Sequence, residues 1–115
     1  MQEKQWRLPS ALRLTYFERN MIVSYRDRRT RRFAIGETVP AFQGFARQAY
    51  RRLEILDAAT SLEDLRALPS NRLEALGGDR FGQHSIRINA QWRICFEWKV
   101  GEPGPGNVEI VDYHK

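Results

Sequence analysis

The chain has 115 residues, 42% of them hydrophobic and 29% charged, which predicts one folded domain and excludes a disordered chain. Its net charge of +5 favours an acidic partner, of which nucleic acid is the commonest. The single cysteine, Cys95, excludes an internal disulfide and is expected to be an inert buried thiol. With only two histidines beside it, a zinc site is improbable, and no apolar run is long enough to span a membrane. We therefore expect a cytoplasmic protein without metal or cofactor.

The first 20 residues differ from the rest of the chain, because their apolar side chains fit neither a helical nor a strand spacing and Pro9 interrupts them. Two interpretations are open for this segment. It is either a helical arm that begins after Pro9 or an extension upstream of a true start at Met21, and we favour the second. Residues 21–115 would then form the folded domain, which opens with a short strand pattern at residues 21–25.

Two helices are predicted in the first half of this domain. Five arginines within residues 26–32 indicate the solvated face of a short helix, or otherwise a ridge that contacts phosphates or a partner, and Gly36 is a plausible end of this helix. Residues 41–59 form a clearer helix with one apolar stripe. Its members are Phe42, Phe45, Ala46, Ala49, Leu53 and Leu56. Arg47 and Arg51 lie off this stripe and face water or a partner.

The second half of the domain is predicted to be a meander of strands. A capping-box spacing at Ser61 predicts a short helix that ends before Pro69, and the apolar period then changes to two, which is typical of strands. The predicted strands are residues 71–76, 84–89, 92–98 and 107–111, and the predicted turns are residues 77–82 and 101–106. Helices followed by a meander predict an α+β fold with the helices on one face of the sheet.

The last predicted strand ends on a carboxylate, a phenol and an imidazole, in Asp112, Tyr113 and His114, and the strand before it carries Arg93. Brought side by side, these groups can bind a phosphodiester and move its protons. His114 is the candidate acid or base because imidazole titrates near neutral pH. Arg93 is the candidate phosphate ligand because its forked guanidinium is permanently charged. Asp112 would orient the imidazole, and Tyr113 would stack on a base or position the phosphate.

Structural roles are also open for these residues. Arg93 would serve a purely structural role if it formed a cross-strand ion pair with Glu97 or Glu109. In a regular strand, Asp112 and Tyr113 point to opposite faces of the sheet. The C-terminal trio therefore converges only if the strand ends or bends at this point.

Several short segments follow one another in a characteristic order along the second half of the chain. They are Gly78-Asp79-Arg80, Gly82, Ser85-Ile86-Arg87-Ile88-Asn89, Gln91-Trp92-Arg93-Ile94 and Val108-Glu109-Ile110-Val111-Asp112-Tyr113-His114. Read together, they resemble the HigB-type toxins of the RelE/ParE superfamily of toxin–antitoxin systems, over roughly residues 21–114. The resemblance implies a RelE-like fold, in which N-terminal helices pack on one face of a twisted antiparallel sheet.

The resemblance also implies an activity and partners. It implies a small ribonuclease that cleaves mRNA in the ribosomal A site by metal-free attack of a ribose 2′-hydroxyl on the phosphodiester. The expected partner is a HigA-like antitoxin with a helix-turn-helix DNA-binding domain. Arg47 and Arg51, on the predicted long helix, would contact ribosomal RNA or the antitoxin.

One departure from the family pattern concerns Gly77, where the family usually has a lysine that would stabilise the transition state. Some members carry a histidine where Glu74 stands, so Glu74 is a candidate base. Arg80 and Arg87 are candidate RNA-binding residues that would compensate for the missing lysine. We therefore expect weakened cleavage. Two alternatives stay open, namely a ParE-like poison of DNA gyrase and a basic binding module without catalysis.

Overall fold

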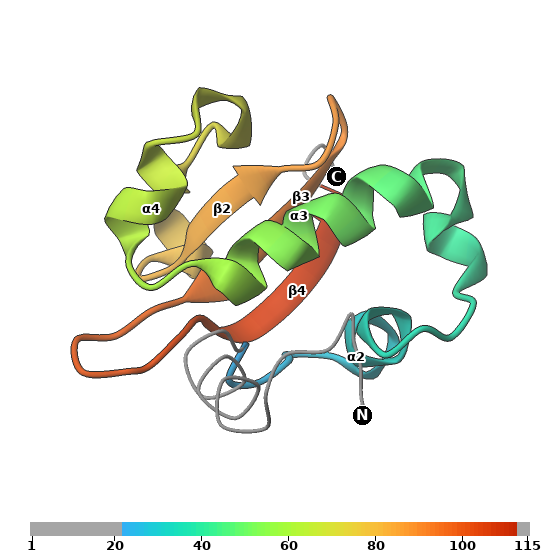
Figure 1. Ribbon diagram of the computed structural model, residues 1–115, viewed down its shortest axis with the longest axis horizontal. Helices are drawn as coiled ribbons and strands as arrows, with labels where there is room; N and C mark the ends of the chain where they lie inside the picture. Colours follow the sequence, from blue (N-terminus) through green and yellow to red (C-terminus); the bar gives the residue numbers. More distant parts are fainter. Residues whose placement is uncertain (1–21, 113–115) are drawn as a thin grey trace, which may run out of the picture.

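The computed structural model describes residues 22–112, in which helices cover one face of a four-stranded antiparallel sheet (Figure 1). The predicted extension at residues 1–20 lies outside the described residues, as do Tyr113 and His114. The strands, in sheet order, are β1 (Glu74–Ala75), β2 (His84–Arg87), β3 (Trp92–Glu97) and β4 (Gly106–Asp112). The helices are α2 (Arg28–Ala34), α3 (Ala46–Ala58) and α4 (Leu62–Arg66), with 3-10 turns η1 (Pro40–Phe45), η2 (Pro69–Asn71) and η3 (Gly78–Arg80). The predicted α+β layout is confirmed.

The core lies between α3 and the sheet, with α4 on the same side (Figure 1). The stripe predicted for the long helix is buried, except that Ala46 is half-buried, and Arg47 and Arg51 are exposed as expected. The sheet contributes the other half of the core. Its fully buried side chains are Ile86, Ile94, Phe96, Val108 and Ile110. Burying each such side chain stabilises the fold by about 1.5–3 kcal/mol, so the core between α3 and the sheet is the main source of stability.

The predicted helix at residues 41–59 is wrong at its start, because α3 begins only at Ala46. Residues Pro40–Phe45 form a 3-10 turn instead, and Phe45 has a non-helical backbone (φ −138°, ψ 25°). The Phe45 ring packs 4.8 Å from Trp92 and 5.8 Å from Phe42, measured between ring centroids. Aromatic packing across the core therefore overrides the helical period at this point.

The predicted strand at residues 71–76 is also mostly wrong. Only Glu74 and Ala75 pair with β2, at Ser85 and His84. Before them the chain turns through η2, and Arg72 adopts a left-handed backbone (φ 48°, ψ 54°). This local bend prevents a longer strand. The strand predicted at residues 21–25 is reduced to one parallel bridge, between Tyr25 and Val108.

Side-chain caps explain where the two short helices begin. Asp27 accepts a hydrogen bond from the Thr30 N–H at the start of α2, and Gly36, at φ +103°, follows its end as predicted. The predicted cap at Ser61 is confirmed, because its hydroxyl accepts from the Asp64 N–H at 3.3 Å. Within residues 22–112, no helix is both long and apolar enough to cross a membrane.

The first described segment is held to α3 by a carboxylate. The Asp57 Oδ1 atom accepts a hydrogen bond from the Ile22 N–H at 2.8 Å. Burial raises the pKa of the Asp57 carboxyl above its usual range, and the bond from Ile22 offsets this only in part. Between the unfolded value of about 3.9 and the raised native value, the native state binds more protons than the unfolded chain. The free energy of unfolding therefore falls as pH rises through this window.

We expect the Asp57→Asn variant to lack this loss of stability, because asparagine keeps an oxygen acceptor for Ile22 but cannot ionise. Urea unfolding at a series of pH values between about 4 and 7, a window set by the carboxyl reference value, measures the difference. The wild type should lose stability relative to the variant as pH rises. Parallel curves for the two proteins would contradict this account of Asp57.

Candidate active site

The sheet has a second face, which we call the polar face, pointing away from α3. Cross-strand register places its residues opposite one another in two rows. The first row runs across all four strands, and the second across β2, β3 and β4. Their members are Glu74, Ser85, Cys95 and Glu109, then Arg87, Arg93 and Val111. Polar and charged groups are thus concentrated on the face that the core does not use.

Arg93 is the most buried charge on the polar face, with 8% of the residue exposed. Its Nε donates to the Ser85 hydroxyl at 2.8 Å, and its Nη2 donates to the Arg72 carbonyl at 2.7 Å. The Glu74 carboxylate lies 3.6 Å from the same Nη2 atom. A buried guanidinium is tolerated only when acceptors surround it, and these contacts supply them. The sequence-based alternative of an ion pair with Glu97 or Glu109 is therefore wrong, since the partner is Glu74.

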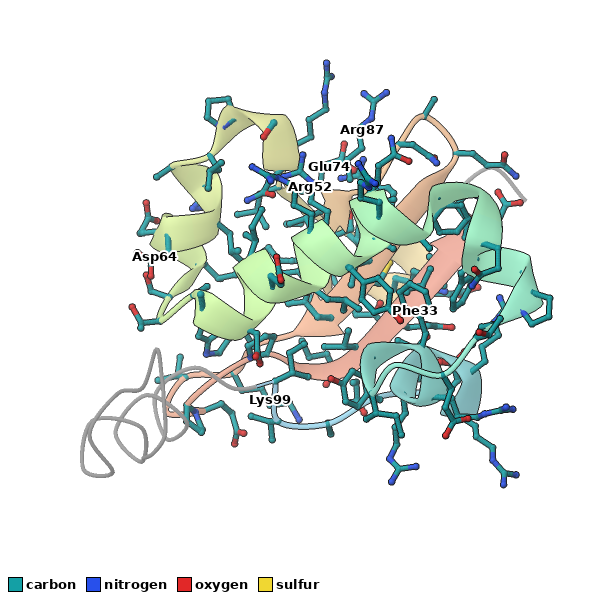
Figure 2. All side chains as sticks on the ribbon, turned by 45° about the vertical axis from the view of Figure 1, so that its right-hand side comes forward. Phe33, Arg52, Asp64, Glu74, Arg87 and Lys99 are labelled. Carbon is teal, nitrogen blue, oxygen red and sulfur yellow. The ribbon has the colours of Figure 1, made fainter. Side chains whose placement is uncertain are left out.

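Arg87 stands directly opposite Arg93 in the register of β2 and β3. Two like charges at such a position repel each other. Among residues 22–112, Glu74 is the carboxylate beside this pair, so these three residues place two positive charges against one negative charge. Figure 2 shows Arg87 and Glu74 at the same end of the molecule. An anion such as a phosphate would relieve the repulsion between the two guanidinium groups.

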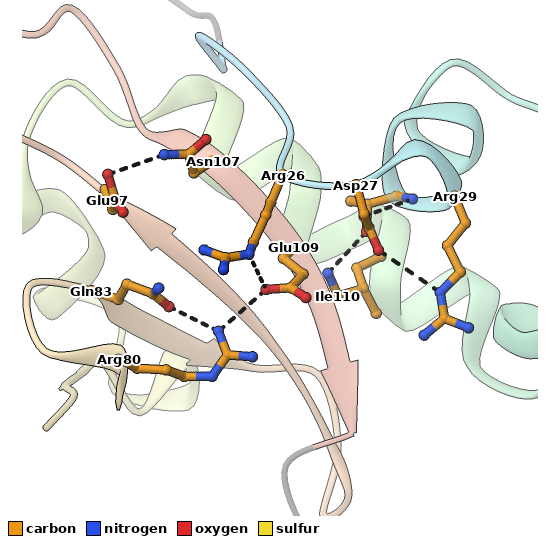
Figure 3. A network of polar contacts seen from close by, with 10 residues as sticks. Arg26, Asp27, Arg29, Arg80, Gln83, Glu97, Asn107, Glu109 and Ile110 are labelled. Carbon is orange, nitrogen blue, oxygen red and sulfur yellow. Dashed lines mark hydrogen bonds and ion pairs between the residues drawn. The ribbon is translucent and has the colours of Figure 1, made fainter. Parts of the chain in front are cut away.

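Arg80 takes part in a network at the other end of the polar face (Figure 3). Its Nη1 lies 3.2 Å from the Glu109 carboxylate and donates to the Gln83 amide oxygen at 2.9 Å. Arg26 reaches the same carboxylate at 3.6 Å. One carboxylate thus holds two arginines, which leaves a positive balance on this surface. The RNA-binding role of Arg80 stays a prediction, and the described contact of its guanidinium is structural.

Asp112 does not share a face with Arg93. It pairs with Trp92 in the sheet register, and the Trp92 ring packs on Phe42 in the core. Strand alternation therefore directs Asp112 to the helix side, where its Oδ2 accepts a hydrogen bond from the Gln91 amide at 2.7 Å. The expectation that the aspartate and the arginine lie side by side is wrong for this reason.

Two titratable side chains of the described residues, Cys95 and His84, are poor candidates for the acid or the base. Burial raises the pKa of the Cys95 thiol, as expected for an inert cysteine. Burial, and then the nearby positive charge of Arg66, lower the pKa of His84, which stacks on Phe96 on the helix side of the sheet. Neither residue is suited to acid–base chemistry on the polar face. The exposed side chains of Arg47 and Arg51 make no hydrogen bond or ion pair with another residue in the range 22–112.

Sequence reasoning missed two of the groups that hold Arg93. Ser85 alternates with the apolar Ile86, so the strand pattern already placed it on the face of Arg93. The Arg72 carbonyl had no such signal, because its direction depends on a left-handed backbone that the strand prediction for residues 71–76 excluded.

The helices followed by a four-stranded antiparallel meander agree with the α+β layout of a RelE-like toxin. The family model for the RelE-like toxin of the type II toxin–antitoxin system HigB matches residues 23–114. The chain therefore belongs to the HigB-like toxin family.

Three curated relatives match part of the chain. Toxin HigB-1 of Vibrio cholerae is 52% identical over 52 residues, covering 45% of this chain and 55% of the relative. Endoribonuclease HigB of Proteus vulgaris is 40% identical over 63 residues, covering 55% and 65%. An uncharacterized protein of Haemophilus influenzae is 35% identical over 52 residues, covering 45% and 52%. The matched part of the chain thus spans about half to two thirds of the length of these relatives.

We expect Ser85 to anchor Arg93 more strongly than Glu74 does. The Ser85→Ala substitution leaves a buried charged N–H without its acceptor and should cost about 1–3 kcal/mol of unfolding free energy. Glu74→Gln weakens a longer contact to a side chain that is 53% exposed, and should cost less than about 1 kcal/mol. Urea unfolding of both variants decides the order, and a larger loss for Glu74→Gln would contradict it.

Proposed function

We propose that this protein is the toxin of a type II toxin–antitoxin pair and acts as an endoribonuclease on mRNA in the cytoplasm. The observation that carries the proposal is the buried Arg93, held opposite Arg87 and beside Glu74 on the polar face. This cluster binds a phosphodiester by its charge and offers a carboxylate next to it. Membership of the HigB-like family and the likeness to the endoribonuclease of Proteus vulgaris support the same reaction.

In the proposed reaction the ribose 2′-oxygen attacks the adjacent phosphorus and the bond from phosphorus to the 5′-oxygen breaks. The products are a 2′,3′-cyclic phosphate and a free 5′-hydroxyl. Glu74 is the proposed base for the 2′-hydroxyl proton, and His114 is the proposed acid that protonates the 5′-oxygen. Arg93 and Arg87 stabilise the negative charge that develops on the phosphate oxygens. All of these steps proceed without a metal ion.

The two other residues of the C-terminal trio have proposed roles beside the phosphate. Asp112 points away from the face of Arg93, so its proposed role of orienting the His114 imidazole beside the phosphate requires the chain to bend after β4. Tyr113 is proposed to stack on a base next to the scissile bond.

The proposed partners are mRNA in the ribosomal A site and a HigA-like antitoxin with a helix-turn-helix domain. Exposed arginines on α2 and α3 supply positive charge for RNA backbone contacts. They include Arg28 and Arg31 on α2 and Arg47 and Arg51 on α3. Such contacts would add affinity without sequence preference, which suits an enzyme that meets its substrate on the ribosome.

We expect expression of residues 21–115 to arrest growth and to create new mRNA 5′ ends, and we expect His114→Ala to abolish both effects. The matched control is His84→Asn, which changes the other histidine and should leave arrest intact because His84 lies on the helix side of the sheet. Growth curves and mapping of mRNA 5′ ends give the result. Arrest without new ends would favour the gyrase-poison alternative, and full cleavage by His114→Ala would refute its role as the acid.

A lysine at position 77 should increase cleavage. The Gly77 backbone (φ −120°, ψ −167°) accepts any residue, and no atom lies within 4 Å of an added Cβ. Gly77→Lys therefore adds a cation without strain, and one further charge on the transition state is worth roughly 10- to 100-fold in rate. The cleavage rate of reporter mRNA on ribosomes, with Gly77→Ala as the control for the backbone, measures the effect. An equal rate for the lysine and alanine variants would contradict a role for charge at this position.

A further inference from the structure

We propose that Asn71 and Arg72 are positioning residues, which fix the Arg93 guanidinium through a backbone carbonyl. The Asn71 side chain holds the turn, the turn holds Arg72 in a left-handed conformation, and the Arg72 carbonyl then accepts from Arg93. The inference rests on the proposed function in one respect, namely that Arg93 binds the phosphate.

Asn71 is fully buried and its side chain joins two helical elements. Its Nδ2 donates to the Leu65 carbonyl in α4 at 3.0 Å, and its Oδ1 accepts from the Arg52 guanidinium of α3 at 2.6 Å. The Asn71 backbone N–H donates to the Leu68 carbonyl at 2.9 Å, which closes the turn. A buried amide with both ends bonded has one orientation, so it fixes the backbone that carries it.

Arg72 follows in the left-handed region, which costs a residue with a Cβ roughly 1–2 kcal/mol. Such backbone conformations persist only where the surrounding structure imposes them, and they gather at functional sites. The Arg72 side chain is exposed and takes no part in holding the turn. Its carbonyl oxygen, however, accepts from the Arg93 Nη2 at 2.7 Å. The strained conformation thus supplies an acceptor for Arg93 on the polar face.

A carbonyl is a suitable acceptor because it holds the guanidinium without cancelling its charge. The Arg72 and Ser85 contacts are 2.7 Å and 2.8 Å long, whereas the Glu74 carboxylate stands at 3.6 Å. The two neutral groups therefore fix the plane of the guanidinium, and the more distant carboxylate screens it only in part. Neutral acceptors of this kind orient the guanidinium without adding negative charge beside it.

The first test reads the position of Arg93 without reference to activity. In ¹⁵N-labelled protein the Arg93 Nε–H signal is identified by its loss in Arg93→Lys, and its exchange with water is measured. In Asn71→Ala we expect this signal to move and to exchange at least about 10-fold faster. The matched control is Ser70→Ala, which removes an exposed hydroxyl that accepts only a long 3.4 Å bond from Arg52 and should leave the signal in place. An unchanged Arg93 signal in folded Asn71→Ala would overturn the proposal.

The second test measures cleavage by the same variants. A displaced guanidinium lowers the rate of the chemical step, so kcat of Asn71→Ala should fall roughly 10- to 100-fold while KM changes little. A wild-type protein without cleavage would refute the proposed function, while the Arg93 signal would still decide the positioning role. Full kcat with a displaced signal would overturn the positioning role.

A milder variant keeps the proposal testable if Asn71→Ala does not fold. Arg52→Met removes the donor to the Asn71 Oδ1, together with a longer 3.4 Å bond to the Ser70 hydroxyl. We expect the Arg93 signal to move in the same direction by a smaller amount, with a smaller loss of kcat. An Arg93 signal identical to that of the wild type would again overturn the proposal.

Discussion

The structure depends on one constraint, which is the burial of a guanidinium in the second strand from the edge of its sheet. The Arg93 guanidinium is almost inaccessible to solvent, so the chain around it must supply hydrogen-bond acceptors in place of water. Ser85 comes from β2, Glu74 from β1 and the Arg72 carbonyl from the turn before β1. The bend that shortens β1 to two residues is the same bend that turns the carbonyl inward. The irregular part of the fold and the candidate site therefore have one cause.

The two faces of the sheet have different roles, because one face packs in the core and the other carries the candidate site. The helix side carries aliphatic and aromatic side chains that α3 and α4 cover, and the polar face carries the charges. Because a strand alternates its side chains, neighbouring positions on β3 and β4 serve different tasks. Ile94 and Ile110 pair in the core, while Arg93 and Val111 pair on the polar face. A residue of β3 or β4 can move from one face of the sheet to the other only if its strand shifts by one residue in the register.

Much of this fold follows from local pattern, and its departures follow from distant contacts. The stripe from Phe42 to Leu56 and the alternation around Ile86 and Ile94 were enough to predict the long helix and the inner strands. The early break at Phe45 depends on Trp92, which is far away in sequence. The turn at residues 69–72 likewise depends on Arg52, through a buried amide that no periodicity reveals. For the candidate site, the sequence singled out Arg93 as a candidate, but the residues that surround it could be identified only from the strand register.

The pairing of the first described segment with the last strand has a consequence for the order of folding. Ser24 accepts from the Asn107 N–H across 83 positions of sequence, and Thr30 accepts from the Ile110 N–H across 80. Because β4 also fills the core with Val108 and Ile110, neither α2 nor β3 has its full set of neighbours until β4 has been synthesised. Contacts of such long range form late and slow the folding reaction. A chain that has not yet reached β4 therefore lacks both its native sheet and the core that Val108 and Ile110 complete.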